Sequence, residues 1–123
     1  MESGLSGLFF VPGSATRDPT AESTDPVIVE IECLATPPGT DDVPYKHIEA
    51  AIAVIQRSGL SYEVEALGTT IEGSPDQLWG VMREVHEACL AAGAKSVVTI
   101  IKAYQGANDT GASVATLTGK FRG

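Results

Sequence analysis

Residues 62–78 hold two strands and the start of a helix in one stretch, YEVEALGTTIEGSPDQL. Side chains 62–67 alternate between two faces, with both glutamates on the same face, which is typical of a half-buried strand. Gly68 breaks this strand, and residues 69–72 resume as a short partner. Two strands in direct succession predict a hairpin, so the sheet contains at least one antiparallel pair.

The helix after this hairpin carries several start and stop signals. Ser74 suits the N-cap, Pro75 suits the first helical position, and Gln77 sits where a capping box places its third residue. Gly93 is the expected terminator. One apolar face runs between these ends and consists of Leu78, Val81, Met82, Val85, Cys89 and Ala92.

The same patterns predict a strand and a helix before the hairpin and a strand after the second helix. Residues 27–34 alternate, with Val27, Val29, Ile31 and Cys33 on one face, and a helix is expected from about Pro44 to Arg57. Ser96 to Ala103 is rich in β-branched residues and predicts the last strand. The order β-α-β-β-α-β predicts an α+β fold, an antiparallel sheet with two helices on one face.

Composition divides the chain into a folded middle and two tails. Residues 1–25 are rich in Gly, Ser, Thr, Pro and Asp, and residues 106–123 are rich in Gly, Thr and Ser. We therefore expect a flexible N-terminal arm and a flexible C-terminal tail. The domain is then residues 26–105. Within the arm, the apolar Leu8–Val11 patch could dock on the chain's own surface or on a neighbouring subunit.

The charge balance limits the partners. Asp and Glu outnumber Lys and Arg by 16 to 8, for a net charge of −8 over 123 residues, so nucleic acid and anionic membranes are poor candidates. A cationic or neutral small molecule fits better, although acidity also serves solubility alone. Cys33 and Cys89 lack metal-ligand spacing and are expected as reduced core thiols. Without a signal sequence or a membrane span, the expected location is the cytoplasm.

The sheet face away from the helices is where function is expected. It should carry the carboxylates Glu30, Glu32, Glu63 and Glu65 together with a few apolar side chains. Two interpretations remain open: a solvated sheet surface, or a surface partly covered by a second subunit, with carboxylates that hold a cation. Buried carboxylates would need a positive partner, either Lys102 or a bound cationic ring.

No catalytic or metal-binding constellation can be assembled from the spacing of residues. His47 is expected at the surface, and His86 shares a helix flank with Trp79, which indicates packing or a subunit contact. Glu30 and Glu32, two residues apart on one strand, remain a minor acid–base alternative.

Four segments carry a family resemblance, and the most specific is the Gly-Thr-x-Ile-Glu-Gly motif at Gly68–Gly73. The others are Ser58–Tyr62, His86–Ala88 and Val97–Lys102. In this order and spacing, residues 27–105 resemble the UPF0045 family, whose members are described as thiamine-binding proteins. Relatives usually follow the last strand with a charged polar segment and a short helix, whereas residues 106–123 here are rich in Gly and Thr.

The resemblance implies a ferredoxin-like fold, assembly into a homodimer or homotetramer, and non-enzymatic binding of thiamine or its hydroxymethylpyrimidine part, without a cofactor. The protein would then act in vitamin salvage, delivery or sensing. The expected polar contacts are Glu30, Thr69, Glu72 and Thr99. Two alternatives stay open: a structural or regulatory oligomer with no small-molecule ligand, and, less favoured, a small enzyme on the same scaffold.

Overall fold

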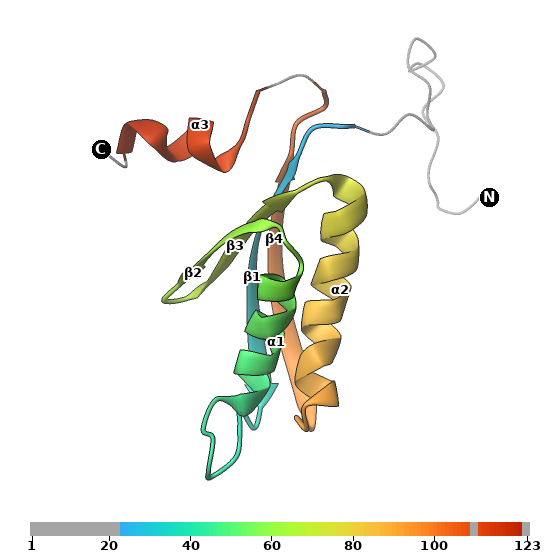
Figure 1. Ribbon diagram of the computed structural model, residues 1–123, viewed down its shortest axis with the longest axis vertical. Helices are drawn as coiled ribbons and strands as arrows, with labels where there is room; N and C mark the ends of the chain where they lie inside the picture. The colour runs from blue at the N-terminus through green and yellow to red at the C-terminus, as the bar shows by residue number, and fades with distance from the viewer. Residues whose placement is uncertain (1–22, 109–110, 122–123) are drawn as a thin grey trace, which may run out of the picture.

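A computed structural model describes residues 23–108 and 111–121 of the chain. The elements follow the expected order, and their arrangement is shown in Figure 1. They are β1 (Val27–Thr36), α1 (Lys46–Arg57), β2 (Ser61–Glu65), β3 (Gly68–Gly73), α2 (Pro75–Ala91), β4 (Ser96–Gln105) and α3 (Val114–Thr118). The strands form one sheet in the order β2-β3-β1-β4, and every neighbouring pair is antiparallel. This is the ferredoxin-like α+β fold that the sequence predicts.

The core lies between the sheet and the two long helices. Val27, Val29 and Ile31 of β1 are buried on the helix side, as their alternation predicts. Ile71 of β3 lies opposite Val29 in the register and is also fully buried. The helices contribute the other large buried side chains, which are Ile55, Leu78, Val85 and Cys89. Both helices therefore cover the same face of the sheet, and we call the opposite face the outer face.

The predicted N-cap of α2, Ser74, is confirmed, but the Gln77 side chain bonds the Ser74 hydroxyl and not the backbone N–H that a capping box uses. The Ser74 hydroxyl accepts a hydrogen bond from the Gln77 backbone N–H at 3.4 Å and donates one to the Gln77 side-chain oxygen at 3.0 Å. Pro75 occupies the first turn, where its missing N–H costs nothing. At the other end Gly93 adopts a positive φ of 125°, a conformation that glycine reaches without steric cost.

The prediction that His47 lies at the surface is wrong. Only 3% of His47 is exposed, and its Nδ1 lies 2.6 Å from the Pro37 carbonyl oxygen. Because a carbonyl oxygen only accepts, Nδ1 carries the proton and donates this bond. His47 thus ties the first turn of α1 to the loop that follows β1, a contact between residues ten positions apart that helical periodicity cannot reveal.

The strands differ in length, and this difference shapes the molecule. β1 and β4 each have ten residues and pair along the whole of β1, from Val27 to Thr36. β3 has six residues, and its ladder with β1 ends at the pair Ile31–Thr69. The second half of β1, residues 32–36, therefore has a neighbouring strand on the β4 side alone within the described part of the chain.

Residues 106–123 contain an element that we did not expect in a flexible tail. Ser113 and Thr116 form a reciprocal capping box that starts α3, and the Val114 N–H donates to a Glu72 carboxylate oxygen at 3.2 Å. The sequence prediction gave weight to the glycines and overlooked this cap. α3 lies at the end of the sheet opposite the loop before α1 (Figure 1).

The start of the described chain is bound to the end of β4. The Ser23 hydroxyl donates to the Gly106 carbonyl at 2.6 Å, and the Thr24 N–H donates to the Asn108 side chain at 2.9 Å. The rest of the expected arm, with its Leu8–Val11 patch, lies outside the described residues. In the described part of the chain, no helix has the length and apolar content needed to span a bilayer.

Candidate binding pocket

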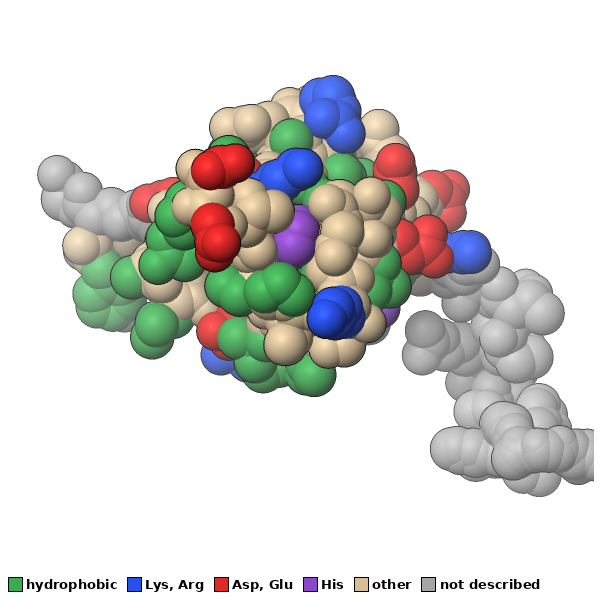
Figure 2. All heavy atoms as spheres, turned by 90° about the horizontal axis from the view of Figure 1, so that it is seen from below, with side chains coloured by type: hydrophobic (Ala, Val, Ile, Leu, Met, Phe, Trp, Pro, Cys, Tyr) green, Lys and Arg blue, Asp and Glu red, His purple; other side chains and the backbone are tan. Residues whose placement is uncertain are grey.

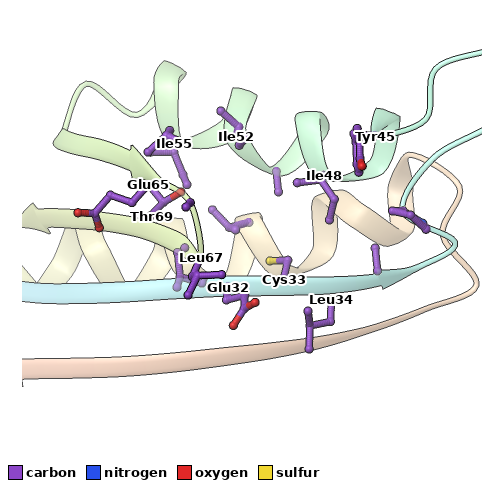
Figure 3. A pocket seen from close by; sticks show the side chains of 18 of the residues that line it. Glu32, Cys33, Leu34, Tyr45, Ile48, Ile52, Ile55, Glu65, Leu67 and Thr69 are labelled. Carbon is purple, nitrogen blue, oxygen red and sulfur yellow. The ribbon is translucent and has the colours of Figure 1, made fainter.

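A cavity of about 370 Å³ opens beside the start of β3, just beyond the last residue pair of its ladder with β1. Its walls come from the second half of β1, from α1 and from the β2–β3 hairpin (Figure 3). The volume lies within the range of about 300–1,000 Å³ that is usual for small-molecule sites. The pocket occupies the place beside β1 that a longer β3 would have filled.

Most of the pocket wall is apolar. Ile48 and Ile55 point from α1 toward β1, and Tyr45 lies at the N-terminal end of the helix (Figure 3). Cys33 and Ala35 face them from β1, and Leu67 stands at the tip of the hairpin. Leu67 is 81% exposed, so this apolar side chain at the rim is available to a ligand or a partner.

Two carboxylates are the charged groups among the lining residues that the structure describes. Glu32 projects from β1 on the side opposite Cys33, and Glu65 ends β2 (Figure 3). The Thr70 hydroxyl donates to Glu65 at 2.9 Å, which holds this carboxylate beside the hairpin. None of the described lining residues is Lys or Arg, so the pocket is acidic as well as apolar.

The outer face has a second hollow, lined by Glu30, Glu32, Leu67, Ile100 and Lys102. Here the Lys102 ammonium lies 2.9 Å from a Glu30 carboxylate oxygen, so Lys102 is the positive partner expected for a carboxylate of this face. The hydrogen bond and the charge of Glu30 raise the pKa of Lys102 above its ordinary value of 10.5. Since both side chains are largely exposed, this pair contributes little to stability.

The structure separates the four site residues expected from sequence. Thr69 is 6% exposed and lines the pocket. Glu30 and Glu72 lie on the outer face, where Glu30 binds Lys102 and Glu72 binds the first turn of α3. Thr99 lies on the helix side of β4, where its hydroxyl is 2.6 Å from His86 Nδ1. The geometry thus brings Glu30 and Glu72 together on the outer face, but not with either threonine.

Several residues of the pocket were not singled out as ligand contacts, among them Glu32, Cys33, Tyr45, Glu65 and Leu67. A signal for them exists in the sequence: the first strand is longer than the segment between Gly68 and Gly73 that pairs with it. Such a mismatch leaves part of the longer strand without a neighbour, and this is where the pocket forms.

The two cysteines are free thiols, and Cys89 has no exposed surface. Burial raises the pKa of the Cys89 thiol to about 11, and the nearby Cys33 thiol adds to this. Cys33 Sγ in turn lies 3.7 Å from the Thr99 hydroxyl. The described residues contain no cluster of three or more His, Cys, Asp and Glu side chains suited to a metal ion.

Viewed from the end that carries the loop before α1, acidic and basic side chains lie among hydrophobic and polar ones without a basic patch (Figure 2). On the outer face, apolar side chains gather along β4 and the adjoining end of β1. They are Leu34, Val98, Ile100 and Tyr104, each 47–60% exposed.

Comparison with known proteins agrees with this architecture at two levels. In fold, the chain is similar to a Bacillus cereus domain of unknown function, DUF77, with 33% identity, a TM-score of 0.71, and coverage of 80% of this chain and 92% of that one. It is also similar to a Thermotoga maritima protein whose name proposes a role in thiamine biosynthesis or salvage. There the identity is 25%, the TM-score 0.66, and the coverage 79% and 99%.

In sequence, residues 31–119 match the family model described as thiamine-binding protein, and the chain belongs to this family. A UPF0045 protein of Clostridium perfringens is 33% identical over 58 residues, which are 47% of this chain and 61% of that protein. A UPF0045 protein of Methanothermobacter thermautotrophicus is 29% identical over 77 residues, 61% of this chain and 78% of that protein. The chain thus spans somewhat less than two thirds of the Clostridium relative.

Proposed function

We propose that this protein binds thiamine or a related hydroxymethylpyrimidine, without transforming it, in the pocket between α1, the end of β1 and the β2–β3 hairpin. One observation carries the proposal: an apolar pocket of about 370 Å³ whose charged lining residues, among those described, are both carboxylates. The family name and the name of the Thermotoga relative support the ligand class.

The chemistry of thiamine suits this pocket. Its pyrimidine is a flat ring that apolar walls can sandwich, and Ile48, Ile52 and Ile55 offer such a wall along α1. Its thiazolium carries a fixed positive charge, which Glu32 and Glu65 at the rim would attract. A hydroxymethylpyrimidine lacks that charge and would not gain from this attraction.

Assembly into a homo-oligomer is part of the proposal, and the outer face supports it. Leu34, Val98, Ile100 and Tyr104 form an exposed apolar stripe on the sheet face that neither α1 nor α2 covers. A second copy of this face would bury the stripe. Light scattering coupled to size exclusion measures this directly, and a monomeric mass at micromolar concentration contradicts it.

Calorimetric titration with thiamine and with hydroxymethylpyrimidine tests binding. We expect saturable heat at micromolar concentrations of thiamine, weaker binding of the uncharged pyrimidine, and recovery of unchanged thiamine after incubation. A folded oligomer that gives no heat with either compound supports the alternative of an oligomer without a ligand. Turnover of thiamine would instead make the protein an enzyme.

A matched pair of variants tests the acidic rim. Glu65→Gln removes a charge that lines the pocket, and Glu63→Gln removes the same charge two residues earlier on the same face of β2, outside the lining. Loss of one charge–charge attraction near a surface predicts an affinity for thiamine that is up to about 5-fold weaker with Glu65→Gln. Equal effects of both variants would mean that the rim is not where the cation lies.

A further inference from the structure

The backbone of β1 turns its free edge toward the pocket. Ile31 directs its carbonyl oxygen to β3, where a Cβ added to Gly68 would lie only 3.2 Å from that oxygen. Thr36 directs its carbonyl oxygen the other way and accepts from the Lys95 N–H at 2.8 Å, beside β4. Because these directions alternate along a strand, Cys33 and Ala35 point as Ile31 does, toward the space that β3 has left.

That space is the pocket. The ladder between β1 and β3 stops at Ile31–Thr69, and no strand in the described part of the chain lies beside Cys33 and Ala35 on this side. Both residues line the cavity, and Ala35 is buried. Backbone groups that are removed from water without a partner cost free energy, so an occupant that can pair with them is favoured.

The pattern of this edge restricts the occupant. On one side of a strand, each residue presents one N–H donor and one C=O acceptor. A carboxylate or phosphate offers acceptors alone and would leave the carbonyl of Cys33 unpaired, and the rim carboxylates Glu32 and Glu65 repel it as well. A planar ring with an acceptor nitrogen next to an amino group satisfies both backbone groups at once.

We propose that the free backbone edge at Cys33 and Ala35 is the specificity element of the pocket, and that it recognises the edge of an aminopyrimidine by a paired donor and acceptor. This inference rests on the proposed function and adds to it which part of the ligand the protein recognises, namely the edge of the pyrimidine ring. The apolar wall of α1 then holds the ring in plane with the strand, and the rim carboxylates contact whatever cationic group the ring carries.

A comparison of thiamine with oxythiamine tests the proposal. Oxythiamine keeps the cationic ring and the overall shape but replaces the amino group with an oxo group and protonates the neighbouring nitrogen, which exchanges donor and acceptor. Sites built around hydrogen bonds reject analogues that leave them unpaired, so we expect binding weaker by roughly 100-fold or more. Equal affinity overturns the inference and leaves the proposed function standing. Failure of both compounds to bind overturns the proposed function together with the inference.

Hydrogen exchange of single amides gives a second readout that requires no variant. On saturation with thiamine, exchange at Cys33, at Ala35 or at both should slow, and the corresponding amide resonances should shift downfield. Leu34, whose amide points to β4, is the internal control and should not change. Saturated protein in which the Cys33 and Ala35 amides behave as they do without ligand overturns the inference.

Discussion

The two halves of β1 have the same kind of sequence and different surroundings. Residues 27–31 have a strand on each side, whereas residues 32–36 have β4 on one side and a cavity on the other. In the first half every backbone group is used by the sheet, and substitutions there should act on stability. In the second half the backbone and the side chains are available to a ligand, and substitutions there should act on binding.

Ile31→Ala against Leu34→Ala should give the largest contrast in stability. Ile31 is the last residue paired on both sides and is 3% exposed, whereas Leu34 is 47% exposed. Removing a buried isoleucine costs about 2–5 kcal/mol, because contacts are lost and a cavity remains. Within a single subunit Leu34→Ala should cost about 0.5 kcal/mol or less as a surface change, so both variants are compared at a protein concentration at which the subunits are separate. Urea denaturation measures both, and equal costs would mean that the two halves do not differ as described.

Alkaline unfolding should report on the thiol beneath the middle of β1. The pKa of Cys89 is about 11 in the folded state and 9.0 when unperturbed, so the folded protein holds this proton more tightly. Its contribution to stability is complete below pH 9 and is lost as the pH rises toward 11. The loss should be on the order of 2 kcal/mol. Denaturation of the wild-type protein and of Cys89→Ala at several pH values measures this loss. The free energy of unfolding of Cys89→Ala should change less between pH 9 and pH 11 than that of the wild type.

Filling the pocket should separate binding from stability in the second half of β1. Ile52→Trp places a larger side chain on the α1 wall of the pocket, and Gln56→Trp places the same side chain on an exposed position one turn later. We expect Ile52→Trp to weaken thiamine binding by at least about 10-fold, or about 1.4 kcal/mol. Titration measures the affinity, and circular dichroism checks the fold. A loss of affinity with Gln56→Trp as well would place the ligand elsewhere.

The paired half of the molecule could be predicted from the sequence because its signals are local. Alternation places Val27, Val29 and Ile31 on one face, and the Ser74–Pro75–Gln77 cap locates the start of α2. Each of these features acts within one or two turns of chain, where periodicity and capping preferences decide the structure. These features also agree with one another, which is why the element order and the side of the helices are as expected.

The pocket half could not be predicted in the same way. Its walls come from residues as far apart as Cys33, Ile52 and Leu67, which the fold alone brings together. His47 shows the same limit. Its buried ring donates a hydrogen bond to a carbonyl in the loop after β1, and helical periodicity contains no information about that loop. The chemistry of Glu30 and Thr99 suits polar ligand contacts, but the sheet places the two residues on opposite faces, where each has a partner within the chain. Residue type alone therefore does not identify a site.

The ion pair between Glu30 and Lys102 should have the smallest effect, although it lies in the paired half of β1. Lys102 Nζ and Glu30 Oε1 are 2.9 Å apart, but the Lys102 side chain is 77% exposed, so water and salt screen the attraction. Because the pKa of Lys102 is raised in the folded state, the pair stabilises the protein below pH 10.5 and loses its effect as the pH rises further. In the dissociated subunit, Lys102→Met should therefore lower stability only slightly at pH 7, and less still in 1 M salt, as measured by thermal unfolding at low protein concentration. At protein concentrations at which a second copy covers the outer face, we expect a larger loss that depends less on salt; the same small loss there would mean that Lys102 stays outside the interface.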